Sequence, residues 1–128
     1  MGKLPGAVRL GGLVSLFLCG AAQAGCLSAD TEVTLEGRVL EGLFAGPPEF
    51  TSVARGDEPH MAQFLYLSEP ICVAADADLE MEAVAAVELM QLACDRTPLP
   101  MGEFVEVTGR LFPAHTGYHH TRVLLQCN

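Results

Sequence analysis

The stretch TEVTLEGRVL (31–40) alternates apolar and polar side chains, and this pattern decides how the rest of the chain is interpreted. Apolar or small residues stand at every second position, which is the period of a β-strand that buries one face; they are Val33, Leu35, Gly37 and Val39. The stretch EFVEVTGRLF (103–112) repeats the pattern, again with a central glycine, Gly109. Glycine inside a strand indicates a bulge or a sharp bend such as a barrel corner. Two bent strands predict a small closed barrel.

Three further stretches have the composition of strands, namely MAQFLYL (61–67), AVAAVELMQL (83–92) and TRVLLQC (121–127). The second is ambiguous, because Ala, Glu, Leu and Met favour helices, and one amphipathic helix over 78–93 is the alternative. The prolines of the link CDRTPLPMG (94–102) leave room for at most one turn of a connecting helix. Five strands with bent first and fourth members predict an all-β fold, a small five-stranded barrel of the oligonucleotide/oligosaccharide-binding (OB) type.

Residues 1–24 have the three-part layout of a secretory signal peptide, with a basic start, an apolar run and a small-residue pattern. We expect cleavage after Ala24. A lipoprotein with Cys26 as the lipidated residue is the alternative. No later segment approaches the roughly 20 apolar residues that a membrane span needs. We therefore expect a single domain over residues 25–128, located in the periplasm or secreted.

The cleaved product would be strongly acidic. Lys3 and Arg9 leave with the signal, so residues 25–128 keep five basic residues, all arginine, against sixteen Asp and Glu, a formal net charge of −11. Nucleic-acid affinity depends on cationic neutralisation of phosphates, so this composition argues against nucleic acid as a partner.

Four cysteines remain once Cys19 has left with the signal, and exported cysteines are usually paired. They allow three connectivities, and none has the C-x-x-C spacing of zinc or redox sites. In a β-meander the start of the first strand adjoins the end of the second, which brings Cys26 near Cys72. The third and fifth strands of an OB barrel run parallel, which brings Cys94 near Cys127 at one rim. We therefore predict the disulfides Cys26–Cys72 and Cys94–Cys127.

Several segments together resemble a known bacterial family. They are VTLEGRV (33–39), GPPEFTSVARGDEPHMAQFLYLSEPICV (46–73), MQL (90–92) and GEFVEVTGRLFPAHTGYHHTRVLL (102–125). In this order they resemble domain of unknown function 4431, a family of small exported proteins that end in a Thr-Gly-His-His-His-Thr type segment. The sequence departs from that pattern at Tyr118, where the family more often has histidine. The resemblance implies an exported β domain without an established activity.

No complete catalytic constellation is visible in the sequence. Ser28, Ser52 and Ser68 lack a nucleophile-elbow context, and no G-x-S-x-G, H-E-x-x-H or phosphate-binding glycine loop occurs. The acidic stretch DADLEME (76–82) spaces carboxylates by two, but it lacks the glycine and the final acid of a calcium loop, so a solvated acidic surface is favoured. We expect no enzymatic activity and no cofactor.

The first of two functional hypotheses is a binding module of the cell envelope for a protein, peptide or glycan. OB barrels bind ligands with the loop between strands one and two, here Gly42 to His60, and the loop between strands four and five, here Pro113 to Tyr118. The candidate contact residues lie in or beside these loops; they are Phe44, Phe50, His115, Thr116, Tyr118, His119 and His120. The two phenylalanines could instead cover one end of the barrel.

The second hypothesis is a metal-binding or metal-sensing protein, with zinc, copper or nickel as candidate ions. If the fifth strand starts near His119, then His119 and His120 point to opposite faces, so the chelating pair would be His115 with His119. Zinc normally takes three or four protein ligands. Because this set falls short, the sequence favours a structural or recognition role for the histidine segment.

Overall fold

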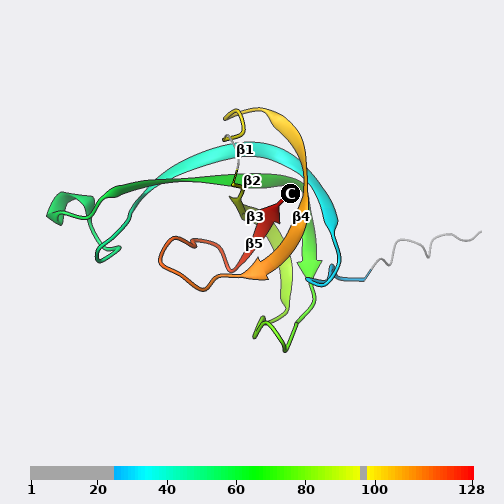
Figure 1. The fold of residues 1–128 in the computed structure, drawn as a ribbon. Coiled ribbons are helices and arrows are strands. Elements are labelled where there is room, and N and C mark those ends of the chain that lie inside the picture. Colours follow the sequence, from blue (N-terminus) through cyan, green and yellow to red (C-terminus); the bar gives the residue numbers. More distant parts are fainter. Residues whose placement is uncertain (1–24, 96–97) are drawn as a thin grey trace, which may run out of the picture.

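Five strands form the regular structure of the described residues, 25–95 and 98–128, in a computed structural model of the chain. They are β1 (Val33–Ala45), β2 (Pro59–Val73), β3 (Val84–Ala93), β4 (Phe104–Pro113) and β5 (Val123–Cys127), and a short 3-10 turn, η2 (Val53–Arg55), lies between β1 and β2. The strands close into a barrel in the order β1-β2-β3-β5-β4, with β3 and β5 parallel and the other neighbours antiparallel (Figure 1). This arrangement confirms the five-stranded OB-like barrel.

The segment that could have been a helix is a strand. β3 pairs antiparallel with β2 from Gln63↔Leu92 to Val73↔Val84, with two register shifts, and its other edge pairs parallel with β5. The described part of the 94–102 link contains no helix, and residues 96–97 lie outside the described chain, as does the predicted signal peptide. None of the described residues forms a helix with the length and apolar character to cross a membrane.

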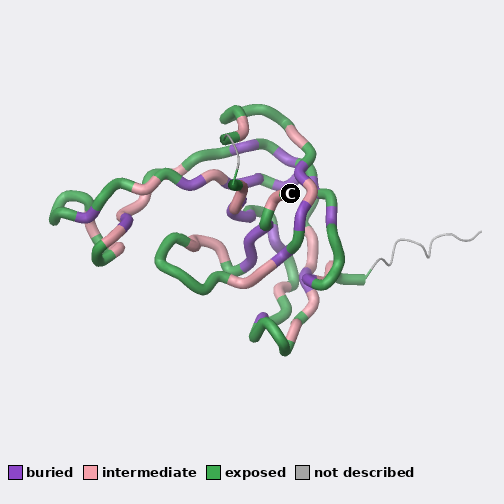
Figure 2. The backbone as a smooth tube through the Cα atoms, viewed as in Figure 1, coloured by how far each residue is buried: buried purple, intermediate pink, exposed green. Residues whose placement is uncertain are grey.

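The barrel interior is filled by the apolar positions that alternate along each strand. The most deeply buried of these side chains are Val39, Leu65, Met90, Leu111 and Leu125, each at most 1% exposed. Figure 2 shows buried segments along the barrel strands and exposed ones in the loops. The alternation that predicted the strands therefore also defines the core, because successive side chains of a strand point to opposite faces.

The central glycines of β1 and β4 are explained by the close approach of the neighbouring strand. A Cβ atom added at Gly37 would lie 2.2 Å from the backbone oxygen of Tyr66, and one at Gly109 would lie 2.0 Å from that of Gln126. Both obstructing atoms belong to backbone that is paired in the sheet. Glycine is therefore needed here for space, as the barrel-corner interpretation of the sequence implies.

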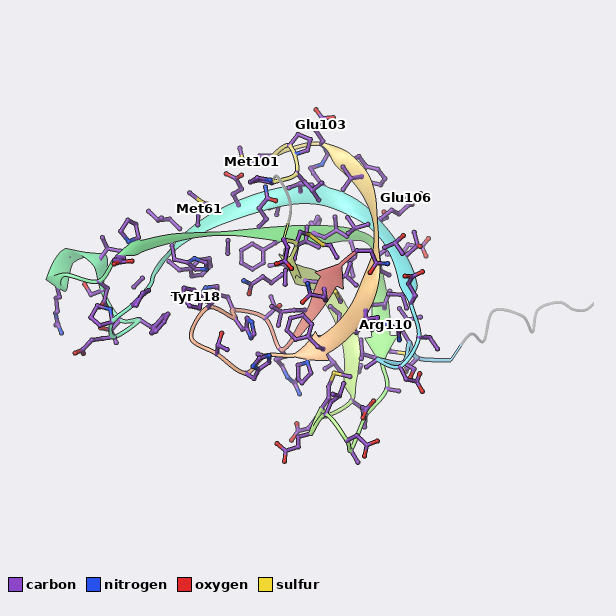
Figure 3. The ribbon with its side chains drawn as sticks, in the orientation of Figure 1. Met61, Met101, Glu103, Glu106, Arg110 and Tyr118 are labelled. Carbon is purple, nitrogen blue, oxygen red and sulfur yellow. A yellow bond between two sulfur atoms is a disulfide. The ribbon has the colours of Figure 1, made fainter. Side chains whose placement is uncertain are left out.

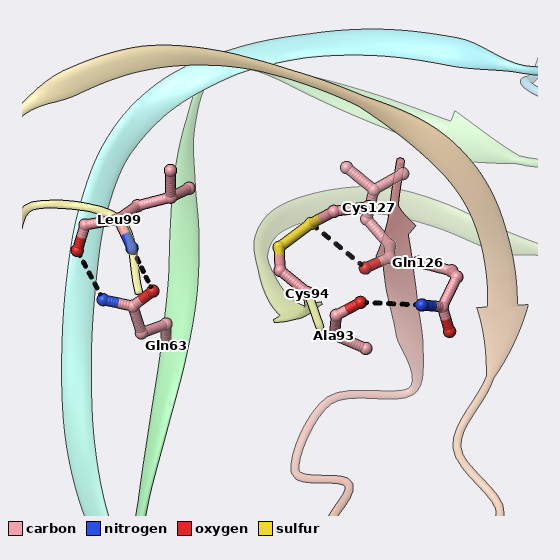
Figure 4. Close-up of a disulfide and its surroundings, with 7 residues drawn as sticks. Gln63, Ala93, Cys94, Leu99, Gln126 and Cys127 are labelled. Carbon is pink, nitrogen blue, oxygen red and sulfur yellow. Dashed lines mark hydrogen bonds between the residues drawn. A yellow bond between two sulfur atoms is a disulfide. The ribbon is translucent and has the colours of Figure 1, made fainter. Parts of the chain in front are cut away.

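Both predicted disulfides are present. Cys26 is bonded to Cys72, and Cys94 to Cys127, each with a Cα–Cα distance of 4.7 Å. Figure 4 shows the second bridge between the ends of the parallel strands, next to the hydrogen bond from Gln126 Nε2 to the Ala93 oxygen. Because a lipid thioether would need the Cys26 sulfur that bonds Cys72, the disulfide does not fit the lipoprotein alternative.

β1 and β2 continue past the barrel as a two-stranded arm, visible in Figure 1, in which residues 41–45 pair with 59–63. The loop between them is therefore shorter than the expected Gly42 to His60 and covers only residues 46–58. The link before β4 is attached to this arm, since Gln63 donates to the Leu99 oxygen at 2.7 Å and accepts from the Leu99 nitrogen at 3.0 Å (Figure 4).

Candidate functional site

The β1–β2 arm and loop meet the β4–β5 loop through five ring-bearing side chains, which we call the loop cluster: Phe44, Phe50, His60, Tyr118 and His120. His120 stacks on Phe44 with ring centroids 3.7 Å apart and planes 9° from parallel. Tyr118 makes edge contacts with Phe50 at 5.1 Å and with His60 at 4.9 Å. The two loops are therefore in contact, and their rings pack against one another. Figure 3 shows Tyr118 in the β4–β5 loop, on the side that faces the arm.

The β1–β2 loop is shaped by Asp57, which the sequence analysis did not single out. The Asp57 carboxylate accepts hydrogen bonds from the backbone nitrogens of Glu49, Thr51 and Ser52 at 2.8 to 2.9 Å. These bonds, above all those from Ser52 and Thr51, lower the pKa of Asp57 from 3.8 to about 2. Its position after Gly56, a turn residue with φ of 114°, is the one sequence signal that marks it.

Phe50 is held by this loop in an unusual backbone conformation. Its φ is 59°, in the left-handed region that a bulky side chain rarely adopts. The ring packs on Gly117 of the other loop, where an added Cβ would lie only 2.8 Å from ring atoms. The Thr116-Gly117 turn thus provides the surface on which Phe50 rests.

The β4–β5 loop is fixed from below by Gln91 of β3, a second residue that the sequence analysis did not identify. Gln91 Nε2 donates to the Tyr118 oxygen at 2.9 Å, and its Oε1 accepts from the His120 nitrogen at 2.6 Å. Gln91 stands between Phe64 of β2 and Leu124 of β5 in the strand register. All three point outward yet are at most 6% exposed, because the loop covers this part of the barrel exterior.

The fifth strand lies within the predicted stretch 121–127 and does not start near His119, the condition on which the opposite-face argument rested. β5 begins at Val123, so His119 and His120 lie in the preceding loop, which runs to residue 122 and is longer than expected. The backbone nitrogen of His120 donates a hydrogen bond to Gln91 Oε1 rather than to a neighbouring strand. The two histidines nevertheless have separate surroundings, since His120 contacts Phe44 whereas His119 contacts Phe112.

His119 is paired with His115, with ring centroids 4.7 Å apart. Its Nδ1 accepts hydrogen bonds from the backbone nitrogens of His115 at 2.9 Å and Thr116 at 3.3 Å. Burial, followed by the charges of His115 and His120, lowers the pKa of His119 below 6.5. Thr116 in turn accepts from the Tyr118 nitrogen through its hydroxyl. These contacts make the His115–His119 pair part of the turn that supports the loop.

His60 and His120 form a second imidazole pair, with ring centroids 5.6 Å apart. The Nε2 atoms of both are buried and have no hydrogen-bond partner among residues 25–95 and 98–128. Burial and the neighbouring His60 lower the pKa of His120. An unsatisfied buried polar atom costs about 1–3 kcal/mol, so this pair is an expensive element of a small domain.

Within residues 25–95 and 98–128, no three His, Cys, Asp or Glu side chains gather closely enough to form a metal-binding group. The acidic stretch 76–82 forms a tight turn in which Asp76 bridges to Met81. Met81 itself is 4% exposed and belongs to the core, while Glu82 is paired with Arg122 at 3.4 Å.

These features define a small disulfide-bonded β-barrel of OB topology whose two long loops pack together at one end. Residues 89–128 match the family model described as Domain of unknown function (DUF4431), which confirms the expected resemblance over this segment. No curated protein and no solved structure matches the chain. The matched segment holds Gln91 together with the part of the loop cluster that Tyr118 and His120 supply.

Proposed function

We propose that the protein is an exported, non-catalytic binding module of the cell envelope, and that the loop cluster contacts a protein, peptide or glycan partner. The observation that carries this proposal is the backbone of Phe50, which is held at positive φ against Gly117 and Tyr118. Such strain costs about 1–3 kcal/mol and concentrates at functional sites.

The imidazole pair supports the same site. His60 and His120 each keep an unpartnered buried Nε2 atom, and unsatisfied polar groups in a folded protein require an explanation. A partner that brought hydrogen-bonding groups to these rings would supply the missing interactions. Tyr118, which is 43% exposed, offers a ring surface beside them.

The expected compartment is consistent with the covalent structure. Two disulfides join cysteines far apart in the sequence, and such bonds persist in oxidising compartments outside the cytoplasm. Together with the signal-peptide pattern of residues 1–24, they support export to the periplasm or medium. The charge of the exported part further supports a partner other than nucleic acid.

The test is capture of envelope components on immobilised protein, with Tyr118→Ala compared with Leu79→Ala. Leu79 lies in the turn between β2 and β3, away from the loop cluster. Both residues are 43% exposed, so each variant removes a large apolar side chain of equal fractional exposure. We expect a component that wild type and Leu79→Ala retain and that Tyr118→Ala binds about tenfold less, a loss of about 1.4 kcal/mol. Equal capture by the two variants would contradict the assignment of the loop cluster.

A second candidate function, metal binding, is favoured by the unpartnered Nε2 atoms of His60 and His120. Zinc, copper and nickel are titrated in turn while the thermal midpoint is followed, since a specific ligand raises it by mass action. A rise in the thermal midpoint that saturates at one ion per chain, that His60→Ala abolishes and that His115→Ala preserves would place the metal at His60 and His120. The reverse pattern would place it at His115 and His119, and no shift with any ion would reject the metal function.

A further inference from the structure

A row of large side chains crosses the outside of the barrel on four adjacent strands. In the strand register Phe104 of β4 lies opposite Arg38 of β1, Arg38 lies opposite Tyr66 of β2, and Tyr66 lies opposite Leu89 of β3. We call these four residues the outer row. Neighbouring strands are about 4.8 Å apart, so the outer row extends over about 14 Å.

The apolar members of the outer row are exposed although they are large. Phe104 is 56%, Tyr66 51% and Leu89 40% exposed. The adjacent row, Phe64, Gln91 and Leu124, is covered by the β4–β5 loop and is nearly inaccessible. None of the described segments covers the outer row in the same way. Tyr66 and Leu89 are direct neighbours, while Arg38 separates Tyr66 from Phe104. Exposed large apolar side chains that gather on a small domain mark an interaction surface.

Carboxylates border the outer row on one side. Glu36 and Glu106 lie opposite each other on β1 and β4, two positions along from Arg38 and Phe104, and like charges in this arrangement destabilise a sheet. Figure 3 shows Glu106 on the outside of β4. A hollow of about 250 Å³ beside Glu36 is also lined by Glu69 and Ile71, among others.

The one cation of the outer row is already engaged. The Arg38 guanidinium donates to the Gly102 oxygen at 2.7 Å, which fixes it along the surface. Glu36 and Glu106, the next outward pair along β1 and β4, outnumber this single positive charge, so this side of the row is acidic, like residues 25–128 as a whole.

We propose that the outer row binds a polypeptide segment that carries both apolar and cationic side chains. The apolar side chains would lie on Phe104, Tyr66 and Leu89, and a lysine or arginine would lay its aliphatic stem on the hollow and its charged end against the carboxylates. A second copy of the chain fits poorly, because it would bring its own Glu36 and Glu106 into the contact. Anionic lipid is disfavoured for the same electrostatic reason. This proposal does not depend on the function proposed for the loop cluster, although the two surfaces adjoin where Leu89 and His120 line the same hollow.

The experiment measures binding of three labelled synthetic peptides to the purified, disulfide-bonded protein by fluorescence anisotropy. The first is an amphipathic helix of leucine and lysine, the second has glutamate in place of every lysine, and the third is oligolysine of the same charge. Tyr66→Ser with Phe104→Ser removes the apolar surface, and Glu36→Gln with Glu106→Gln removes the carboxylates. Leu43→Ser with Met61→Ser is the matched control, since these residues are 63% and 55% exposed on the arm, on the face away from the loop cluster.

We expect only the leucine–lysine peptide to bind wild type. Its affinity should fall about tenfold or more both in the Tyr66/Phe104 serine variant and in the Glu36/Glu106 glutamine variant, and should be unchanged in the arm control. The Glu36→Gln pair keeps the test valid if the serine pair does not fold. The proposal is overturned if the arm control loses as much affinity as the outer-row variants, if oligolysine or the glutamate peptide binds equally well, or if the protein dimerises through this surface instead. Because all these variants leave Tyr118 and Phe50 in place, failure here is distinguishable from failure of the loop-cluster function.

Discussion

Gly109→Ala should destabilise the barrel far more than an exposed glycine substitution does. The added Cβ would lie 2.0 Å from the Gln126 oxygen and 2.8 Å from its carbonyl carbon, and real Cβ contacts essentially never fall below 3.0 Å. β4 and β5 would therefore have to move about 1 Å apart where Gly109 faces Cys127, and a hydrogen bond of about 2.9 Å does not survive that separation. Loss of two ladder bonds at about 1 kcal/mol each, with an overpacking cost of about 1–3 kcal/mol, gives about 3–5 kcal/mol.

The assay is urea unfolding of the oxidised protein, followed by circular dichroism. A loss of 3 kcal/mol lowers the urea midpoint by at least about 1 M, given slopes of about 1–3 kcal/mol per molar urea for small proteins. Gly37→Ala should behave similarly, because its Cβ would meet the Tyr66 oxygen at 2.2 Å. Gly25→Ala is the control, since no atom of the described chain lies within 4 Å of the added carbon. A Gly109→Ala midpoint within about 0.2 M of that control would refute the close-approach explanation.

Three further predictions concern the Cys94–Cys127 disulfide, the pH dependence of His119 and the Asp57 carboxylate that orders the β1–β2 loop. Replacing Cys94 and Cys127 by serine should cost about 3.7 kcal/mol for a sequence separation of 33, measured by the same urea assay, and a loss below about 1 kcal/mol would contradict it. Since burial lowers the pKa of His119, its stabilising contribution is complete above pH 6.5 and is lost as the pH falls through the lower folded-state pKa. Amide exchange in the β4–β5 loop should therefore accelerate at acidic pH. The acceleration should be smaller in His119→Asn, which keeps a hydrogen-bond acceptor but cannot be protonated in this pH range. Asp57→Asn removes an acceptor from the β1–β2 loop, so trypsin should cut faster after Arg55, and an unchanged rate would mean that the carboxylate does not order the loop.

The barrel could be predicted from the sequence because its signals are local or follow from topology. The alternation around Gly37 and Gly109 defines strands and bends, and the parallel placement of the third and fifth strands is sufficient to pair Cys94 with Cys127. The helix-forming composition of residues 83–92 was overridden by the sheet, because Met90 and Leu92 fill the barrel interior. Tertiary packing decides such cases, since helix propensities are worth only tenths of a kcal/mol per residue.

The loop cluster could be predicted only in part. Its residues stood out by type, but nothing in the sequence shows that His60 would meet His120. The β4–β5 loop is positioned by bonds to Gln91, and the β1–β2 loop by bonds to Asp57. An amide in a strand and a carboxylate in a turn have no pattern that distinguishes them from ordinary surface residues. The pairing of His119 with backbone nitrogens likewise depends on the exact turn of the loop before β5.

The place of β5 between β3 and β4 has a consequence for biogenesis. Strand β5 is the last barrel strand to be synthesised, yet it fills the gap between two strands made before it. If the chain is exported from its N-terminus, as proposed above, β1 and β2 can pair first, but the wall of the barrel stays open until Val123–Cys127 has emerged. Cys127 reaches Cys94 only at that moment, so its oxidation would report the emergence of β5, whereas Cys26 and Cys72 are available to an oxidant earlier. Pulse-chase trapping of free thiols during export would therefore see the two bridges form in sequence, the N-terminal one first.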